Sequence, residues 1–443
     1  MSVRRFLKNI VEDVPYPLGK IVAAVPFRWR LGSVYKSMSA EVSRLDRAPA
    51  GMVKEWAFPK LKAIVEHAYG RNLCYRTICE RHGFRPEHFR TFEHFQDAPI
   101  ITKSDLRAFE LADRSVPSPG GMLINTGGTS GEPLAFHIDN QAFAREWAHM
   151  HFIWARAGYR YRDVKLTMRG RNLGERLLKY NPVHNEWIVN TYADRTAVLA
   201  ALSTLMERET VCWIHGYPSI VSEMVSDMAA RDGRATEKLR RSIKGVLLGS
   251  EFPASQYVEP IRRILGVEPT AWYGHSEMCV LAYDEGDNRY IPMHTYGLVE
   301  GVADGGGDSR LLGTSYWNTA SPFIRYDTGD RIQADTEQGV VRSFAIAAGR
   351  FGDFILDRDG TRIALTALIF GRHHAAFDKV RHVQVRQPAP GRIELLVVPG
   401  EERLTPEELM KGFDFSNVAL DVTPHLLDKP VRTDSGKLRL LVP

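Results

Sequence analysis

The segment from residue 194 to residue 273 constrains the fold most, because helical patterns and short apolar strand patterns alternate along it. In chain order the patterns are helix 194–209, strand 211–215, helix 218–230, strand 244–248, helix 255–265 and strand 269–273. This alternation is typical of a parallel sheet with helices on its faces. Because ligands bind beyond the carboxyl ends of such strands, the residues after each strand are the first candidates for a site.

The segments on either side predict helices first and strands later. Apolar residues recur at helical spacing from Trp56 to Tyr69, and Thr102 or Ser104 is placed to cap a following helix. Short strands are predicted at 122–125 and 134–138. Strands and turns dominate from 290 to 345, with a turn at 305–308.

The pattern changes near Gly349-Arg-Phe-Gly-Asp353, after which short strands (355–356, 393–398) and one helix (406–412) follow. We therefore expect two domains in an α/β fold. Residues 1–349 would form a large domain with helix-flanked sheets, and residues 350–443 a small, mobile α+β domain.

Composition excludes several classes of protein. With 443 residues, 44% of them hydrophobic and 25% charged, the chain is neither collagen-like nor wholly disordered nor a disulfide scaffold. A net charge of +5 spread over this length gives no reason to expect a nucleic-acid partner. The four cysteines include no C-x-x-C pair, which suits a reducing cytoplasm.

No apolar run approaches the roughly 18 residues of a spanning helix, so we expect no integral membrane association. Residues 1–36 contain seven Lys or Arg against two acids. This excess predicts a solvated basic face more strongly than a weak membrane-surface patch.

Five polar segments carry the candidate chemistry. The loop Thr126-Gly-Gly-Thr-Ser-Gly-Glu-Pro133 offers glycines and hydroxyls that suit phosphate oxygens, although it is not a Walker A loop and a plain hairpin turn is the alternative. At strand ends lie Gly249-Ser-Glu251 and Tyr273-Gly-His-Ser-Glu277. There Tyr273 can stack on a base and Glu277 can hold Mg²⁺, unless they are a core tyrosine and a surface glutamate.

Two further segments lie nearer the C-terminus. The carboxylate of Asp330, at the end of Phe323-Ile-Arg-Tyr-Asp-Thr-Gly-Asp330, can accept both hydroxyls of a ribose, or it can belong to an ordinary turn. Lys437 stands on a glycine-containing turn, and its alternative is a solvated charge.

The order and spacing of these segments resemble the adenylate-forming superfamily of acyl- and aryl-CoA synthetases. More closely, the chain resembles the phenylacetate–CoA ligase branch, including its capsular-polysaccharide-associated relatives. Ile100-Ile-Thr-Lys-Ser-Asp-Leu106 and His294-Thr-Tyr-Gly-Leu-Val-Glu300 also fit that branch, and the resemblance runs from about residue 50 onward.

The resemblance implies a role for each matching residue. Phosphate would be bound by Thr126, Thr129, Ser130 and Gly131, and the adenine and acyl side would be lined by Gly249, Ser250 and Glu251. The adenine would be flanked by Tyr273 and Gly274, the ribose would be bound by Asp330, and Mg²⁺ would be ligated by Glu277. Near the hinge, Arg350 would contact the nucleotide, and Lys437 would be the mobile catalytic lysine.

Three positions depart from the family pattern. Glu132 stands where a lysine usually precedes the proline, and an extra negative charge there should weaken ATP binding unless it points away. Gly352 replaces the usual hinge Asp or Lys. Some relatives hold zinc, but here only Cys279 and His294 match, too few for a site of three or four ligands.

The resemblance implies ATP-dependent activation of a small carboxylic acid, aryl or related, to an acyl-adenylate, with Mg²⁺, followed by transfer to a thiol such as CoA. His215, Tyr217, Trp272 and His275 lie near strand ends and could line the acid pocket or merely pack. The alternatives are an amine acceptor or a nucleotide-binding homologue without catalysis. A serine hydrolase is disfavoured because Gly274-His-Ser-Glu-Met278 lacks the final glycine of a nucleophile elbow.

Overall fold

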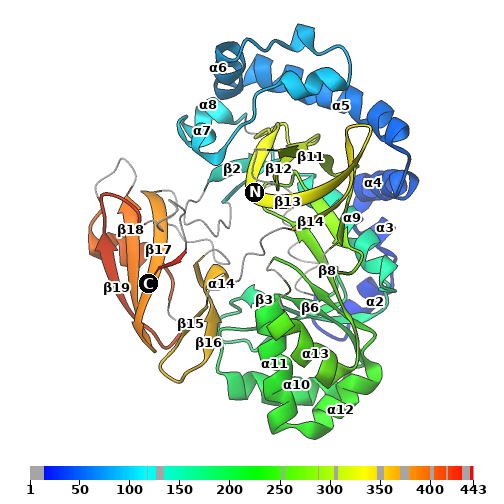
Figure 1. Cartoon of the computed structure of the whole chain (residues 1–443). Coiled ribbons are helices and arrows are strands. Elements are labelled where there is room, and N and C mark those ends of the chain that lie inside the picture. The colour runs from blue at the N-terminus through cyan, green and yellow to red at the C-terminus, as the bar shows by residue number, and fades with distance from the viewer. Residues whose placement is uncertain are drawn as a thin grey trace.

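The computed structural model describes residues 14–116, 118–125, 134–250, 253, 255–287, 289–303, 308–346, 354–369, 379–399, 404–415, 418–431 and 440–442. The chain begins with helices that lie along the right side and the top of Figure 1. They are α2 (Gly19–Ala23), α3 (Phe27–Arg30), α4 (Gly32–Leu45), α5 (Ala50–Arg71), α6 (Leu73–Arg81), α7 (Lys103–Arg107) and α8 (Leu111–Arg114), with 3₁₀ turns at Pro86–His88 and Glu93–Asp97.

Local sequence explains where these helices form. In α5 the buried residues Val53, Trp56, Leu61, Ile64 and Ala68 repeat at helical spacing and form one packed face. Helix α7 begins at a capping box in which Thr102 and Asp105 each bond the other's backbone N–H. The sequence left Thr102 and Ser104 as alternatives for this cap, and the structure selects Thr102.

Twelve strands form one continuous sheet in the order β11-β12-β13-β14-β10-β9-β8-β7-β6-β3-β5-β4. The strands are β3 (Val164–Arg171), β4 (Leu178–Asn181), β5 (Glu186–Asn190), β6 (Val211–Gly216), β7 (Gly245–Leu248), β8 (Pro269–Gly274), β9 (Leu281–Asp284), β10 (Arg289–Pro292), β11 (Gly297–Ala303), β12 (Ser309–Ser315), β13 (Tyr326–Glu337) and β14 (Val340–Ile346).

The parallel half of this sheet confirms the α/β prediction, because β5, β3, β6, β7 and β8 are parallel neighbours. From β8 onward the sheet turns antiparallel through β9, β10, β14, β13, β12 and β11. The sequence predicted strands after residue 290 but not that they extend the parallel sheet. Strand β8 is therefore the junction between the two halves.

Helices cover both faces of the parallel half. Alternate residues of β6 and β7 point to opposite sides: Ile214 and Val246 join one core with α10 (Arg195–Arg208), α11 (Pro218–Arg231), α12 (Gly233–Ser242) and α13 (Ser255–Leu265). Trp213 and Leu247 join another core with α3, α4 and α9 (Ala142–Arg156). Helices α9 and α12 have no counterpart among the predicted elements.

A two-stranded antiparallel hairpin, β1 (Met122–Asn125) and β2 (Ala135–Ile138), confirms the strand predictions on either side of the glycine-rich loop. The loop itself, residues 126–133, lies outside the described residues, as does most of the turn predicted at 305–308.

The last part of the chain builds a separate four-stranded sheet in the order β19-β18-β17-β20, at the left of Figure 1. Its elements are β15 (Phe354–Leu356), β16 (Arg362–Ala364), α14 (Leu365–Ile369), β17 (Val380–Ala389), β18 (Arg392–Pro399), α15 (Pro406–Gly412), β19 (Asp421–Leu426) and β20 (Leu441–Val442). Buried side chains from Ile355 to Leu440 form a core of their own around this sheet. The mixed α/β class, with a large N-terminal sheet and a small C-terminal one, agrees with the prediction.

Candidate active site

The structure describes part of the predicted site. Gly249, Ser250, Tyr273, Gly274, Glu277, Asp330, His215, Tyr217, Trp272 and His275 lie within the described residues. Thr126, Thr129, Ser130, Gly131, Glu251, Arg350 and Lys437 lie outside them, as do Glu132 and Gly352. Most of the described candidates lie at or just after the carboxyl ends of β6, β7 and β8, where ligands bind in sheets of this kind.

Tyr273 and Asp330 form a direct pair, although 57 residues separate them in the chain. The Tyr273 hydroxyl donates to Asp330 Oδ2 over 2.6 Å. Both side chains are half-buried, and the Tyr273 ring packs edge-on against Phe344 of β14. This contact brings the predicted adenine-flanking residue and the predicted ribose-binding residue to one place.

Glu277 is a buried carboxylate held by two donors. His275 Nδ1 lies 3.0 Å from Glu277 Oε2, and the Tyr326 hydroxyl donates to Glu277 Oε1 over 3.0 Å. Burial alone would raise the pKa of the Glu277 carboxyl, but the charge on His275 and its hydrogen bond lower that pKa to about 2. The surface-glutamate interpretation is therefore wrong, because the side chain is buried and ionised.

His275 is the cation of this pair. Burial opposes its charge, but Cys279 and Glu277, one on each ring nitrogen, raise the pKa of His275 well above its usual value. The sequence grouped His275 with the acid-pocket candidates, whereas its hydrogen-bonding contacts are with the candidate metal ligand. At neutral pH the site thus holds an imidazolium–carboxylate pair at the end of β8.

Three aromatic side chains pack together beside the ends of β6 and β7. The ring centroid of His215 is 5.6 Å from that of Trp272 and 4.9 Å from that of Trp154 on α9. Nδ1 of His215 is buried without a hydrogen-bond partner, and burial lowers the pKa of the ring well below its usual value. A neutral histidine between two indoles is a mostly apolar surface with one unused polar atom.

Gly249 belongs to the same group because of how closely Trp272 approaches it. A Cβ at residue 249 would lie 2.2 Å from the Trp272 indole, far inside contact distance. Only glycine lets the indole lie against this end of β7, so the backbone of Gly249 and the ring of Trp272 share one surface.

Arg169 is a candidate site residue that the sequence analysis did not identify. It lies near the end of β3, where it donates to Ser250 Oγ over 3.4 Å and lies 5.9 Å from the Tyr217 ring centroid. Its side chain is exposed, so it places a positive charge beside the ends of three parallel strands. The alternation in Val164-Lys-Leu-Thr-Met-Arg169 is a strand signal that could have revealed it.

Tyr326 was also missed, since three strands separate β13, which carries it, from β8 in the sheet order, and no local spacing links it to Glu277.

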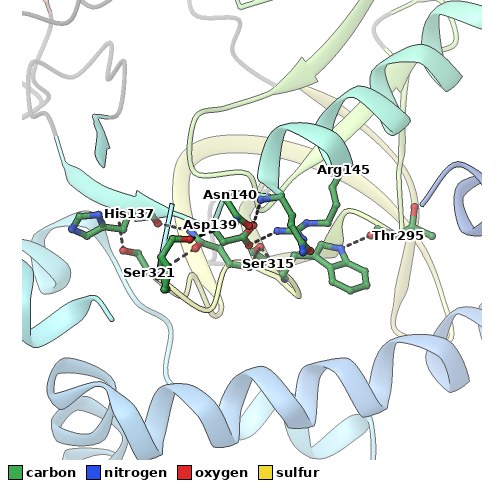
Figure 2. Close-up of polar contacts among 11 residues, drawn as sticks. His137, Asp139, Asn140, Arg145, Thr295, Ser315 and Ser321 are labelled. Atoms are coloured by element: carbon green, nitrogen blue, oxygen red, sulfur yellow. Dashed lines mark hydrogen bonds and ion pairs between the residues drawn. The ribbon is translucent and has the colours of Figure 1, made fainter. Parts of the chain in front are cut away.

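The hairpin that carries the glycine-rich loop is anchored by polar contacts, shown in Figure 2. The backbone N–H of His137 donates to Ser321 Oγ over 2.8 Å, and Asn318 Nδ2 donates to the carbonyl of His137 over 3.0 Å. Just after β2, Asp139 forms an ion pair with Arg145 of α9. These contacts fix the strand that follows the loop against both α9 and the turn before β13.

The described residues offer Mg²⁺ a carboxylate rather than a complete set of protein ligands. Among the described residues no group of three or more His, Cys, Asp or Glu could bind a metal ion on its own. Mg²⁺, however, is commonly bound by one or two carboxylates together with substrate phosphates. Glu277 fits that mode, provided that its carboxylate exchanges a hydrogen bond for the ion.

No family model matches the sequence, and no curated protein matches it. Solved structures do match the fold. A 2-hydroxyisobutyryl-CoA ligase in complex with 2-HIB-AMP and CoA in the thioesterification state is 17% identical, with a TM-score of 0.57 over 90% of this chain and 91% of that one.

The same ligase in the postadenylation state with R3-HIB-AMP gives a TM-score of 0.56 at 17% identity, again over 90% and 91% of the two chains. An open conformation with 2-HIB-AMP and CoA gives 0.53 at 16% identity, over 89% and 92%. The chain therefore shares the fold of this CoA ligase over nearly its whole length, and the likeness extends to the fold alone.

Proposed function

We propose that this chain is an adenylate-forming ligase, which activates a carboxylic acid with ATP and transfers the acyl group to a thiol such as CoA. One observation carries the proposal. The Tyr273–Asp330 pair and the buried Glu277 meet at the end of β8, in a fold shared with a ligase crystallised with an acyl-AMP and CoA.

The nucleotide would lie beside Tyr273, with its ribose hydroxyls on the carboxylate of Asp330. A carboxylate can accept both hydroxyls of a diol, and the hydrogen bond from Tyr273 orients this one. The glycine-rich loop, Ser250 and Arg350 would contribute the remaining contacts to phosphates and base.

Adenylation needs charge stabilisation, because a carboxylate oxygen attacks the α-phosphorus while the bond to pyrophosphate breaks. Mg²⁺ bound with the phosphates would neutralise part of that charge. This chain's contribution is the ionised Glu277, held by His275 and Tyr326. Lys437 would add a cation near the α-phosphate, and a positioned charge of this kind is worth a few kcal/mol.

The second half-reaction is thioester formation. The sulfur attacks the acyl carbon, AMP leaves, and the thiol proton is lost to solvent or a base. We propose residues 350–443 as a small domain that turns about the 349–352 segment between the two steps. The C-terminal sheet supports this, because it has a hydrophobic core of its own, and a unit with its own core can move as a body.

The acid pocket would be formed by His215, Trp272 and the backbone of Gly249, with Tyr217 and Arg169 at its edge. Aromatic walls favour an aryl or compact alkyl acid. The branch we propose is the phenylacetate–CoA ligase-like one. An amine acceptor is the main alternative, since neither the described site nor the fold distinguishes a thiol from an amine.

Acid-dependent release of pyrophosphate from ATP tests the proposal. Purified protein is given a panel of aryl and aliphatic acids, with CoA, with an amine, or with neither. We expect pyrophosphate release with at least one acid, and we expect AMP to form faster when CoA is present. ATP binding without pyrophosphate release from any acid would instead support a homologue that has lost catalysis.

Lys437→Ala separates the two steps. The variant should release pyrophosphate on the order of a hundredfold more slowly, yet consume acyl-adenylate supplied from outside. Parental pyrophosphate release by the variant would show that Lys437 is a surface charge.

A further inference from the structure

The segment from Leu18 to Trp29 exposes more large apolar side chains than its length warrants. Leu18, Ile21, Val25 and Trp29 are 62%, 72%, 39% and 69% exposed. They make up four of the nine large exposed hydrophobic residues in the described part of the chain, within twelve residues. Single exposed apolar residues are normal on a protein surface, but a clustered set marks an interaction site.

The orientation of this segment is the reverse of that expected for an ordinary surface helix. Gly19 and Ala23 face the protein, while the bulkier Leu18, Ile21 and Val25 face outward. The inward face is closely packed, because a Cβ on Gly19 would lie 2.9 Å from the Tyr180 ring. The segment therefore buries its smallest residues and presents large apolar ones.

Several contacts hold the segment in place. Lys20 pairs with Glu209 over 2.7 Å, and the hydroxyl of Tyr16 donates to the same carboxylate. The Phe27 ring stacks on His151 at 3.8 Å between centroids, and Arg30 donates to the carbonyls of residues 182 and 183. The outward apolar stripe is thus held by the fold, rather than being the loose end of a chain.

Charge points to what covers this stripe. From residue 1 to residue 40 the sequence has seven Lys or Arg against two acids, and both acids precede residue 14. Arg28 and Lys36 are exposed, and the guanidinium of Arg28 lies 5.9 Å from the Trp29 ring centroid. Apolar residues with an interfacial tryptophan and flanking cations are the composition of segments that lie in an anionic bilayer surface.

We propose that Leu18, Ile21, Val25 and Trp29, with the basic residues around them, form a surface that docks on anionic phospholipid. The side chains would enter the headgroup layer, while Arg28 and Lys36 meet lipid phosphates. Among the described residues no helix is long and apolar enough to cross a bilayer, so the contact is peripheral. The proposal is independent of the function proposed above.

The surface and the C-terminal sheet lie on opposite sides of the molecule in Figure 1. In Figure 1, α2 and α3 lie at the right edge and the four-stranded C-terminal sheet lies at the left edge. A bilayer against α2 and α3 would leave the C-terminal sheet clear of the membrane.

Vesicle flotation of the full chain tests the proposal, with phosphatidylcholine vesicles that contain or lack phosphatidylglycerol. We expect binding to the anionic vesicles and its loss at high salt, because salt screens exposed charges. Ile21→Ser combined with Trp29→Ser should lower the partition coefficient by about tenfold or more. Leu73→Ser, a leucine 50% exposed at the start of α6, is the matched control and should bind as the parent does.

Two further measurements complete the test. Brominated lipids should quench part of the parent's tryptophan fluorescence, and Trp29→Phe should remove that part. Circular dichroism and melting temperature should be unchanged in all variants. Absence of binding to anionic vesicles, or equal binding by the double variant, overturns the proposal. Self-association that the double variant abolishes, without vesicle binding, would show that a second copy covers the stripe and would overturn it too.

Discussion

Glu277 accepts a hydrogen bond from Tyr326 and forms an ion pair with His275, so its negative charge is fixed at the end of β8. Glu277→Gln keeps the shape and removes the charge. We expect acid-dependent pyrophosphate release to fall about a hundredfold or more, because the variant no longer supplies a charged ligand beside the triphosphate.

Tyr326→Phe is the control for this change, since it removes one hydrogen bond and leaves the charge. It should cost much less activity than Glu277→Gln. Equal rates for Glu277→Gln and the parent at ordinary Mg²⁺ would contradict the role proposed for the carboxylate.

We propose that Asp330 binds the ribose, a part of ATP that does not react. Such a contact contributes equally to the ground state and the transition state, so its loss raises KM without lowering kcat. Asp330→Ala should therefore raise the KM for ATP about tenfold or more and leave that for the acid nearly unchanged. Tyr273→Phe, which removes only the hydrogen bond to Asp330, should have a smaller effect in the same direction. A change confined to the KM for the acid would contradict the proposed role of Asp330.

At the level of elements, the ends of β7 and β8 form one surface because Gly249 admits the Trp272 indole. A methyl group at residue 249 has no room, so Gly249→Ala must displace the ring. Overpacking of this kind usually costs about 1–3 kcal/mol. We expect the KM for the acid to rise more than that for ATP.

A double variant tests whether the contact between a methyl group at residue 249 and the Trp272 indole causes the rise in KM. In a Trp272→Leu background the smaller side chain leaves room, and Gly249→Ala should then cost much less. If Gly249→Ala is equally harmful in both backgrounds, the backbone of Gly249 matters for another reason.

At the level of the whole molecule, the small C-terminal sheet has its own core, and the segment 349–352 joins it to the large sheet. Gly352→Pro restricts the backbone where rotation is proposed. We expect one half-reaction to be lost and the other spared, measured as pyrophosphate release and as consumption of supplied acyl-adenylate. Equal loss of both in a folded variant would count against rotation at this segment.

Buried histidines predict how the whole fold responds to acid. Burial lowers the pKa of His149 and His294 to about 4, and that of His151 and His215 well below the usual value. When pH falls below about 6.5, the unfolded chain binds protons that the folded chain does not, so stability falls with pH.

Each of these four histidines should remove roughly 1 kcal/mol of stability for each pH unit below about 6.5, until its folded pKa is reached. The melting temperature at a fixed scan rate should therefore be clearly lower at pH 5.5 than at pH 7.5. His294→Leu should reduce the difference in melting temperature, because leucine cannot bind a proton. The change breaks no hydrogen bond at Nδ1 of His294, since that atom is buried without a partner. An identical melting temperature at the two pH values would contradict the argument.

The sequence by itself determined the local elements and their order. Apolar spacing predicted the helices and parallel strands between residues 194 and 273, and the hairpin strands on either side of the glycine-rich loop, because periodicity and turn residues act within a few positions. It also placed Tyr273 and Glu277 at a strand end, four residues apart. These features need no knowledge of the rest of the chain.

Only the tertiary structure decided which distant groups meet. The bonds from Tyr273 to Asp330 and from Tyr326 to Glu277 cross 57 and 49 residues, and they exist because the antiparallel strands continue the parallel sheet. The outward stripe from Leu18 to Trp29 is equally invisible to local pattern, since its apolar residues read as core until their exposure is known. Pairing and burial are set by the packing of whole elements, which no short window of sequence contains.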